Sequence, residues 1–391
     1  GLFRMSPLRI VPGGLRIVAA LLLLTPSVSA SIRECRQLFL TGQYAECLQM
    51  ADEAVQRRAY GEDWPILKLR SQRELGHCLQ ALATATQGIQ RYPWSIRLHY
   101  EAYLSYQQLG QADQADETLR EINRLAGATP WRYSDADDLV TLGQAALAAG
   151  ADPKDVLQGF FERARRNFGG RPDGVLASAE LAIEKGDFAF AAELLAAARE
   201  AFPENPYVLW AQSRTLRGSD PKAAESARLA TLQINSRFKP ALLAEAGRLI
   251  DREQFDQAEQ VIAEIRQDDP FHPKACGLLA AVHRLRNDAT KADESRVAGL
   301  VHNPLSPWPD HMTGLTLSRR YRFAEGAALQ RQALQLRPDW LPARAQLAQD
   351  LLRLGDRDEG WLLAENAHRQ DGYDTQLFNL LQLHDSLDRF E

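Results

Sequence analysis

Apolar and small residues recur along the chain in a pattern that indicates paired helices. Within the range 174–203, apolar residues follow helical spacing from Val175 to Ile183, pause at Gly186, and resume from Ala191 to Ala201. Apolar positions three and four residues apart place one face of each helix toward a core. Pro203 then ends the second helix, because proline cannot continue a helix interior. This segment therefore predicts two helices joined by a tight turn.

The same unit recurs through most of the chain. Equivalent turn positions follow one another at spacings of 32 to 40 residues: Gly42, Gly76, Gly110, Gly150, Gly186, Gly218, Glu253, Asn287, Tyr321 and Gly355. Five residues beyond a turn, the residue is usually small: Cys47, Ala81, Ala115, Ala191, Ala223, Ala258, Ala292 or Gly360. A small side chain lets two helices approach closely, whereas a bulky one forces them apart. Self-similarity at this period predicts a helical solenoid.

The pattern resembles the tetratricopeptide repeat (TPR), and the resemblance covers roughly residues 31 to 370 in about ten units. It implies an all-α solenoid of TPR-type helix-turn-helix repeats that forms a right-handed superhelix, held together by interfaces between neighbouring units. We therefore treat 31–373 as one solenoid rather than as separate domains. The fourth unit departs from the pattern, with an insertion at 151–154 and Gly170-Arg171-Pro172 after its second helix. We expect this unit to be distorted.

Residues 1–30 have the layout of a secretory signal peptide. Arg9 and Arg16 supply positive charge, residues 17–24 are uninterrupted and apolar, and small residues lead to Ala30. The apolar run is too short to span a bilayer stably. We expect cleavage after Ala30, export to a periplasm or to the extracellular space, and no membrane insertion afterwards. The alternative is an uncleaved membrane anchor.

Residues 374–391 carry an apolar helical stripe formed by Leu377, Phe378, Leu380, Leu381, Leu383, Leu387 and Phe390. We interpret it either as a terminal amphipathic helix or as the start of a downstream domain. The stretch from Leu377 to Glu391 also resembles the junction in large exported bacterial TPR proteins, where a zinc metallopeptidase-like domain follows the repeats. That resemblance implies a second function, the recognition arm of a larger secreted enzyme.

The composition and motifs give little support for catalysis within this chain. The eight histidines include no pair four residues apart, so no helix presents a two-histidine zinc face. No phosphate-binding glycine loop or nucleophile elbow is present. The formal net charge of −5 does not suit nucleic-acid binding. We therefore predict a non-enzymatic protein with no catalytic residues, no metal site, no cofactor and no nucleic-acid partner.

Cys35 and Cys47 lie seven residues before and five residues after the first turn glycine. In the repeat these are close-contact positions on facing helices, which brings their β-carbons within reach of a disulfide. We predict a bridge that fastens the first repeat, by about 2–3 kcal/mol if it is unstrained. The alternative is a pair of buried thiols that fill small-residue positions.

The first helix of each unit is expected to line the concave face of the solenoid. Its exposed positions give a set of candidate partner-binding residues: Arg70, Arg73, Arg97, Tyr100, Arg284, His311, Arg319 and Arg353. The forked guanidinium of arginine suits carboxylate-bearing or extended peptide ligands. The alternative is that these side chains only form a solvated face. We predict an exported scaffold that binds a protein or peptide partner on this face.

Overall fold

The structure is a computed structural model that describes residues 31–388, so the predicted signal peptide lies outside the described residues. Every regular element in this range is helical. The pairs are α1 (Ile32–Leu40) with α2 (Tyr44–Gln56), α3 (Asp63–Glu74) with α4 (Cys78–Arg91), α5 (Ile96–Gln108) with α6 (Ala112–Ala128), α7 (Ala136–Ala148) with α8 (Pro153–Val156) and α9 (Glu162–Asn167), α10 (Asp173–Lys185) with α11 (Phe188–Ala201), α12 (Pro206–Leu216) with α13 (Pro221–Ile234), α14 (Lys239–Asp251) with α15 (Phe255–Asp268), α16 (Pro273–Leu285) with α17 (Ala289–Ala298), α18 (Trp308–Arg319) with α19 (Phe323–Leu336), and α20 (Leu341–Leu354) with α21 (Arg357–Gln370).

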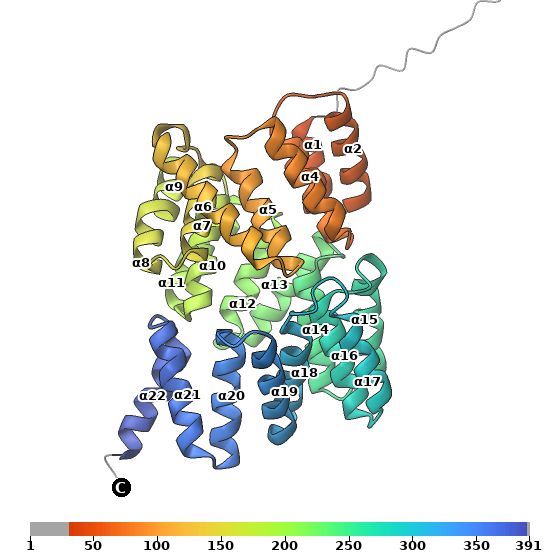
Figure 1. Ribbon diagram of the computed structural model, residues 1–391, viewed down its shortest axis with the longest axis vertical. Helices are drawn as coiled ribbons and strands as arrows, with labels where there is room; N and C mark the ends of the chain where they lie inside the picture. Colours follow the sequence, from red (N-terminus) through yellow and green to blue (C-terminus); the bar gives the residue numbers. More distant parts are fainter. Residues whose placement is uncertain (1–30, 389–391) are drawn as a thin grey trace, which may run out of the picture.

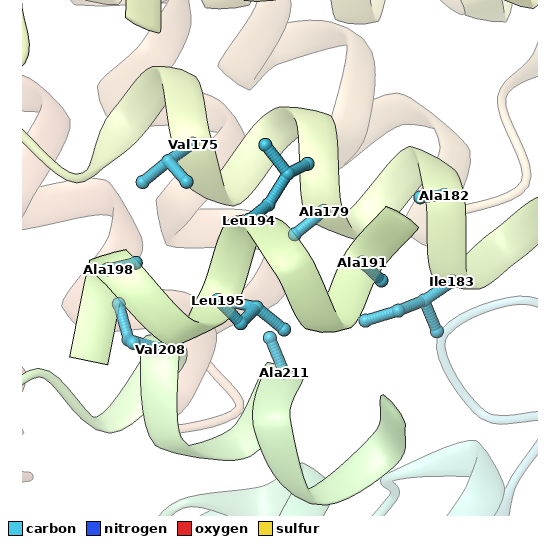
Figure 2. Close-up of a cluster of buried hydrophobic side chains, with 10 residues drawn as sticks. All are labelled: Val175, Ala179, Ala182, Ile183, Ala191, Leu194, Leu195, Ala198, Val208 and Ala211. Atoms are coloured by element: carbon cyan, nitrogen blue, oxygen red, sulfur yellow. The ribbon is translucent and has the colours of Figure 1, made fainter. Parts of the chain in front are cut away.

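Each unit has a small core where its two helices meet the first helix of the next unit. Figure 2 shows this core for the fifth unit, where side chains from α10, α11 and α12 converge. Ala179, Ala191 and Ala211 are fully buried and allow the three helices to approach, while Leu195 fills the space between them. Burying one leucine side chain stabilises a fold by about 1.5–3 kcal/mol. The predicted pairing of helices and the role of the small residues are confirmed here.

The sixth unit differs from the expected register by one residue. Ala224 is buried at the helix contact, whereas Ala223 is only half-buried. The reason is a longer turn after α12, in which Gly218 does not adopt a positive φ and Asp220 caps α13 by accepting from the backbone N–H of Ala223. The prediction that placed Ala223 at the contact was therefore wrong by one position.

The fourth unit is distorted, as the insertion predicted. Its second helix is divided by a π-helical turn over residues 157–161, which separates α8 from α9. Phe161 at the end of this turn is fully buried, and its ring lies where a side chain at Gly143 of α7 would stand. The glycine therefore makes room for a ring that the wider π-turn directs into the core.

The units wind into a right-handed superhelix whose later part lies against its earlier part. In Figure 1, α14 and α15 lie below α1 to α4, and α21 and α22 lie below α8 to α11. Hydrogen bonds connect residues that are 191 to 196 positions apart. With about 34 residues a repeat, this corresponds to between five and six units for each superhelical turn. We call the line of contact between successive superhelical turns the seam.

The seam joins the turns inside early units to the ends of later second helices. Asn235, after α13, donates from its side-chain nitrogen to the Tyr44 hydroxyl at 3.0 Å. Lys239, at the start of α14, donates to the backbone carbonyl and the carboxylate of Glu74. One unit further along, Asn303 donates to the carbonyl of Gln107 at 3.4 Å. The contacts therefore repeat in register with the units, and they fix how tightly the solenoid is wound.

The seam continues toward the C-terminal end after the distorted unit. Lys185, at the end of α10, forms an ion pair of 2.7 Å with Asp371, which follows α21. The Tyr373 hydroxyl donates to the carboxylate of Asp152, which belongs to the insertion of the fourth unit. The insertion that disturbs its own unit therefore contributes a contact to the seam.

The last described helix, α22 (Thr375–Asp388), packs on α21 as an additional helix after the ten pairs. Its apolar stripe is divided between two environments: Leu377 is buried, whereas Phe378 and Leu383 are about half exposed. The amphipathic helix expected in 374–391 is thus present over most of that range. That it begins a downstream domain stays a prediction.

Candidate partner-binding groove

The first helices of the units line the inside of the superhelix, where two recesses lie one after the other. The upper groove has a volume of about 470 Å³ and lies among α3, α5, α7, α10 and α12. The lower groove, of about 830 Å³, lies among α12, α13, α14, α16 and α18. Arg214 on α12 lines both recesses. The inner surface is therefore continuous from the second unit to the ninth.

Helical spacing places one stripe of each first helix in the lower groove. On α14 the stripe is Leu243, Gly247 and Asp251, and on α18 it includes Leu315 and Arg319. Residues four apart on a helix share one face, so each stripe crosses the groove as a single row. Gly247 contributes no side chain, and a β-carbon at that position would lie 3.4 Å from the Arg319 guanidinium. The glycine therefore leaves space for Arg319 to extend over α14.

The charges of the upper groove balance one another. Its cations are Arg70, Arg97 and Arg214, and its anions are Asp137, Asp173, Glu180 and Glu184. Arg97 pairs with Asp63 at 2.8 Å and with Glu62 at 3.1 Å, and Arg214 pairs with Glu180. Although burial opposes it, the surrounding carboxylates raise the pKa of Arg97 above its usual value. These cations are already engaged by partners within the protein.

Cations predominate among the side chains that line the lower groove. The cations of this groove are Arg214, Arg217, Arg228, Lys239, Arg248, Lys274 and Arg319, whereas its anions are only Glu225 and Asp251. Five of these cations form ion pairs: Arg214 with Glu180, Arg228 with Glu225 and Glu245, Lys239 with Glu74, Arg248 with Glu245, and Arg319 with Asp251. Apolar side chains form part of the same wall, among them Trp210, Leu243, Leu278, Met312 and Leu315. The recess thus combines a cationic lining with apolar contact surface.

The structure brings two of the predicted partner-binding arginines onto one buried carboxylate. Arg70 and Arg73 on α3 pair with Glu101 on α5 at 2.5 and 2.7 Å, and Glu101 is almost fully buried. Burial alone would raise the pKa of Glu101, but the two guanidinium groups outweigh burial and hold that pKa below its usual value. These arginines therefore connect the second and third units through a shared partner.

Tyr100 on α5 was predicted beside these arginines on the concave face. Its ring stacks on Tyr103 with the ring centroids 5.6 Å apart, and its side chain is half-buried. Burial raises its pKa, with smaller contributions from Tyr103 and Glu101. Tyr100 therefore packs against its own helix and lines neither of the two grooves.

His311 corrects the prediction that it is exposed on the concave face. Only 6% of its surface is accessible. Its ring lies against Trp308 and Trp340 at centroid distances of 5.9 and 4.9 Å, and its Nδ1 hydrogen-bonds to Gln330 at 2.8 Å. Burial lowers its pKa to about 4 despite this hydrogen bond, so the ring is neutral at pH 7. Two tryptophans from adjacent units enclose it, which sequence spacing alone did not reveal.

The remaining predicted arginines lie in three different places. Arg319 is in the lower groove, 3.2 Å from Asp251. Arg353 lies over the ring of Phe323 and lines a separate recess beside α22. Arg284 lies 3.4 Å from Asp293 of α17 and lines none of these recesses. The predicted set is therefore distributed along the solenoid rather than gathered into one site.

Sequence reasoning missed Arg217 and Lys274, which lie at the ends of their helices. Arg217 directly follows α12, and Lys274 is the second residue of α16. The predicted set came from positions further inside the first helices, so residues at helix ends were not considered. A count of charges over 206–319 would not have revealed the cationic excess, because that range holds 15 Lys and Arg residues against 14 Asp and Glu residues. The excess arises from where the fold places these side chains.

Cys35 and Cys47 lie side by side in the first unit. Their sulfur atoms are 3.4 Å apart, and both side chains are completely buried. They are free thiols in the structure, as are Cys78 and Cys276. The distance exceeds the roughly 2.05 Å of a disulfide bond, so the bridge stays a prediction for which the two residues are suitably placed.

Neither a metal site nor a membrane-spanning helix is present among residues 31–388. No three metal-ligating side chains gather in that range into an arrangement that could hold an ion. None of its helices combines the length and the apolar character needed to cross a bilayer.

Comparison with known proteins gave similarities of structure. No protein-family model matches the chain, and no curated protein matches it. Among solved structures it is similar to the crystal structure of yeast Tom70, with a TM-score of 0.42 and 14% identity over 91% of this chain and 95% of that one. The crystal structure of the APC/C hetero-tetramer Cut9–Hcn1 gives the same TM-score and identity, over 91% of this chain and 83% of the other.

Proposed function

We propose that the chain is an exported, non-catalytic scaffold that binds a protein or peptide partner along the inner face of its superhelix. The observation that carries this proposal is the lower groove, a recess of about 830 Å³ that crosses four successive units. Concave recesses that combine apolar walls with polar groups at fixed positions are typical ligand sites. An extended peptide would contact several units at once, because the stripes of successive first helices lie side by side.

The seam supports this proposal because it holds the groove in one shape. Contacts such as Asn235 with Tyr44 and Lys239 with Glu74 join the wall of the lower groove to the first two units. A surface that is organised before binding loses less conformational freedom when its partner arrives. The winding of the solenoid therefore favours recognition along a fixed inner surface.

Photo-crosslinking tests where the partner binds. A photoreactive amino acid at Met312 lies in the lower groove, and the same residue at the exposed Leu79 on α4 is the control. In cells that produce the full chain, we expect a discrete adduct from position 312 and none from position 79. The same adducts from both positions, or none from position 312, would contradict binding in the groove.

Export is a separate part of the proposal, supported by the arrangement of residues 1–30. N-terminal sequencing of the protein recovered from producing cells should begin at Ser31. A chain that retains residues 1–30 and is found inside the cell would refute export, but it would leave the groove proposal unaffected. The alternative role as the recognition arm of a zinc metallopeptidase predicts an in-frame His-Glu-x-x-His segment downstream of Glu391, which sequencing of the gene would reveal.

A further inference from the structure

The charge of the lower groove is opposite to that of the protein as a whole. The chain has a formal net charge of −5, yet cations greatly outnumber anions along this one recess. The upper groove, built from the same kind of helices, has no such excess. The positive charge is therefore a property of α12 to α18 rather than of the inner surface in general.

Two cations of the lower groove have no carboxylate partner among residues 31–388. Lys274 lies over the ring of Trp308, with its ammonium 3.8 Å from the ring centroid. Burial, and then the charge of Arg214, lower the pKa of Lys274. Arg217 is exposed to solvent, yet partial desolvation and then the neighbouring Arg214 and Arg319 lower its pKa. Desolvation is the larger cause of both shifts, and neighbouring cations add to it without an opposing carboxylate.

His272 lies beside the same cations. It caps α16, where its Nδ1 accepts a hydrogen bond from the backbone N–H of Ala275 at 3.3 Å. Burial, followed by the charges of Lys239 and Lys274, lowers its pKa to about 3. The ring is therefore neutral at pH 7, and an additional proton would be repelled by its neighbours. An anion placed among these groups would relieve that repulsion.

The apolar side chains of the recess indicate which class of anionic ligand fits it. Met312 and Leu315 of α18 lie on the same wall as Arg319, and Leu243 lies on α14 opposite them. A peptide can present carboxylates and apolar side chains together, at spacings that fit rows of cations and leucines. A nucleic acid would place a long line of phosphates against a protein of net negative charge, which opposes its binding outside the groove.

We infer that the lower groove binds an acidic peptide segment, with carboxylates received by Arg217, Lys274 and Arg319 and apolar side chains packed against Met312 and Leu315. This inference rests on the proposed function and specifies the chemistry of its partner. A guanidinium binds a carboxylate through two parallel hydrogen bonds, and an ammonium binds it as a point charge. At Arg217 and Lys274 the carboxylate would supply a partner that these cations lack among residues 31–388, and at Arg319 it would add to the existing pair with Asp251.

Peptide display tests the inference without knowledge of the natural partner. Random dodecapeptides are panned against the full chain, and the charge of the enriched peptides is compared with that of the starting library. We expect enrichment of peptides that combine Asp or Glu with apolar residues. A fluorescent copy of the most enriched peptide should bind more weakly at 300 mM than at 50 mM salt, because salt screens the charges.

Charge-reversal variants then locate the site. Lys274→Glu and Arg217→Glu are each expected to weaken binding of that peptide by about tenfold or more, the range for loss of an interfacial charge pair. Arg120→Glu is the matched control, because Arg120 is exposed on α6 and pairs only with Glu117. Arg217→Ser serves as a neutral variant of an exposed side chain, and the unfolding temperature verifies that each variant is folded.

The outcomes separate the inference from the proposed function. Enrichment of neutral or basic peptides would overturn the acidic class but leave the scaffold proposal standing, and no enrichment at all would count against both. If acidic peptides bind the Lys274→Glu and Arg217→Glu variants as tightly as they bind the unchanged chain, binding in the lower groove would be overturned. Tighter binding of a labelled single-stranded oligonucleotide than of the peptide would overturn the choice of partner.

Discussion

The turns inside the units fall into two groups that share a backbone conformation but not an environment. Gly42, Gly76 and Gly110 have φ values of +80°, +72° and +71°, and each faces the next superhelical turn across the seam. The equivalent turns of later units, away from these contacts, have Glu253 and Tyr321 at φ values of +63° and +62°. The same left-handed turn therefore occurs with glycine where it faces the seam, and with either glycine or a larger residue elsewhere.

This difference distinguishes two reasons why a turn has glycine: its left-handed backbone conformation and the close approach of neighbouring atoms. The left-handed conformation costs a residue with a side chain roughly 1–2 kcal/mol, and the chain accepts that cost at Glu253, Asn287 and Tyr321. A β-carbon at Gly76 would lie 2.9 Å from the Cα of Asp269, where backbone cannot move aside easily. Gly355 has the same conformation with nothing within 4 Å. Close approach, rather than φ alone, therefore makes glycine necessary on the seam.

The largest expected effect comes from adding one methyl group to each kind of turn. Gly76→Ala should destabilise the protein by about 2–5 kcal/mol, since overpacking adds about 1–3 kcal/mol to the cost of the conformation. Gly355→Ala should lose only about 1–2 kcal/mol. Urea unfolding measures both losses, and small-angle scattering shows whether the seam opens. Equal losses would show that the contact with Asp269 imposes no constraint.

Removing one hydroxyl tests the turns on the seam and the turns away from it with a smaller structural change. Tyr44→Phe should destabilise by about 1–3 kcal/mol, because it leaves the buried side-chain nitrogen of Asn235 without its acceptor. Tyr321→Phe, at an exposed turn away from the seam, should change stability by less than about 0.5 kcal/mol. Thermal unfolding of both variants provides the measurement. If Tyr44→Phe leaves the stability unchanged, the hydrogen bond between Asn235 and Tyr44 does not stabilise the seam.

The seam should also depend on pH through Asp269. Burial raises the pKa of this carboxyl above 3.8, although Lys239 and His302 oppose the shift and Glu74 adds to it. The folded chain therefore keeps this proton to higher pH than the unfolded chain, so stability is lost as pH rises through the folded pKa. Asp269→Asn, which copies Asn235 and Asn303, should stabilise the protein at pH 7 and lose that advantage at low pH, where Asp269 is protonated in both the folded and the unfolded chain.

The reverse substitution supplies the control for this pH dependence. Asn303→Asp places a carboxylate at the equivalent point one unit later, beside the turn of Gly110. It should be destabilising at pH 7 and nearly neutral at pH 3, as measured by urea unfolding across the pH range. A stability difference that does not change with pH in either variant would contradict a buried carboxylate on the seam.

The smallest expected effect is a gain in stability, at a turn away from the seam. Tyr321→Gly relieves the left-handed strain of about 1–2 kcal/mol but increases the freedom of the unfolded chain by about 0.5–1 kcal/mol. The Tyr321 side chain is 83% exposed, so little packing is lost. We expect a gain of a few tenths to about 1 kcal/mol in thermal unfolding. A clear loss would show that this aromatic side chain stabilises its turn.

Much of the local structure could be predicted because each unit carries its own pattern. Apolar spacing, a turn and a small residue identified both helices of the fifth unit, and proline marked where the second helix ends. The predicted contact position in the sixth unit was wrong by one residue because Gly218, which lies near the turn, was taken for the left-handed turn residue. Helix boundaries depend on capping, here by Asp220, which competes with any fixed spacing.

The candidate site was predicted less well than the helices. Arg319 was correctly expected on a first helix and lies in the lower groove, but His311 on the same helix is buried between two tryptophans. A register assigns a residue to a face of its helix, and it does not say which neighbouring side chains cover that face. Arg217 and Lys274 escaped notice because the predicted set came from positions inside the first helices, whereas these two lie at helix ends that line the groove.

The sequence by itself determined the repeating helix pair, because apolar period, small contact residues and turn residues act within about 34 positions. Only the tertiary structure decided which turns meet which helix ends, since the seam joins residues 165 to 221 positions apart. The small rotation between neighbouring units accumulates around the superhelix, and no single repeat encodes that sum. The same accumulated rotation gathers the cations of α12 to α18 into one groove.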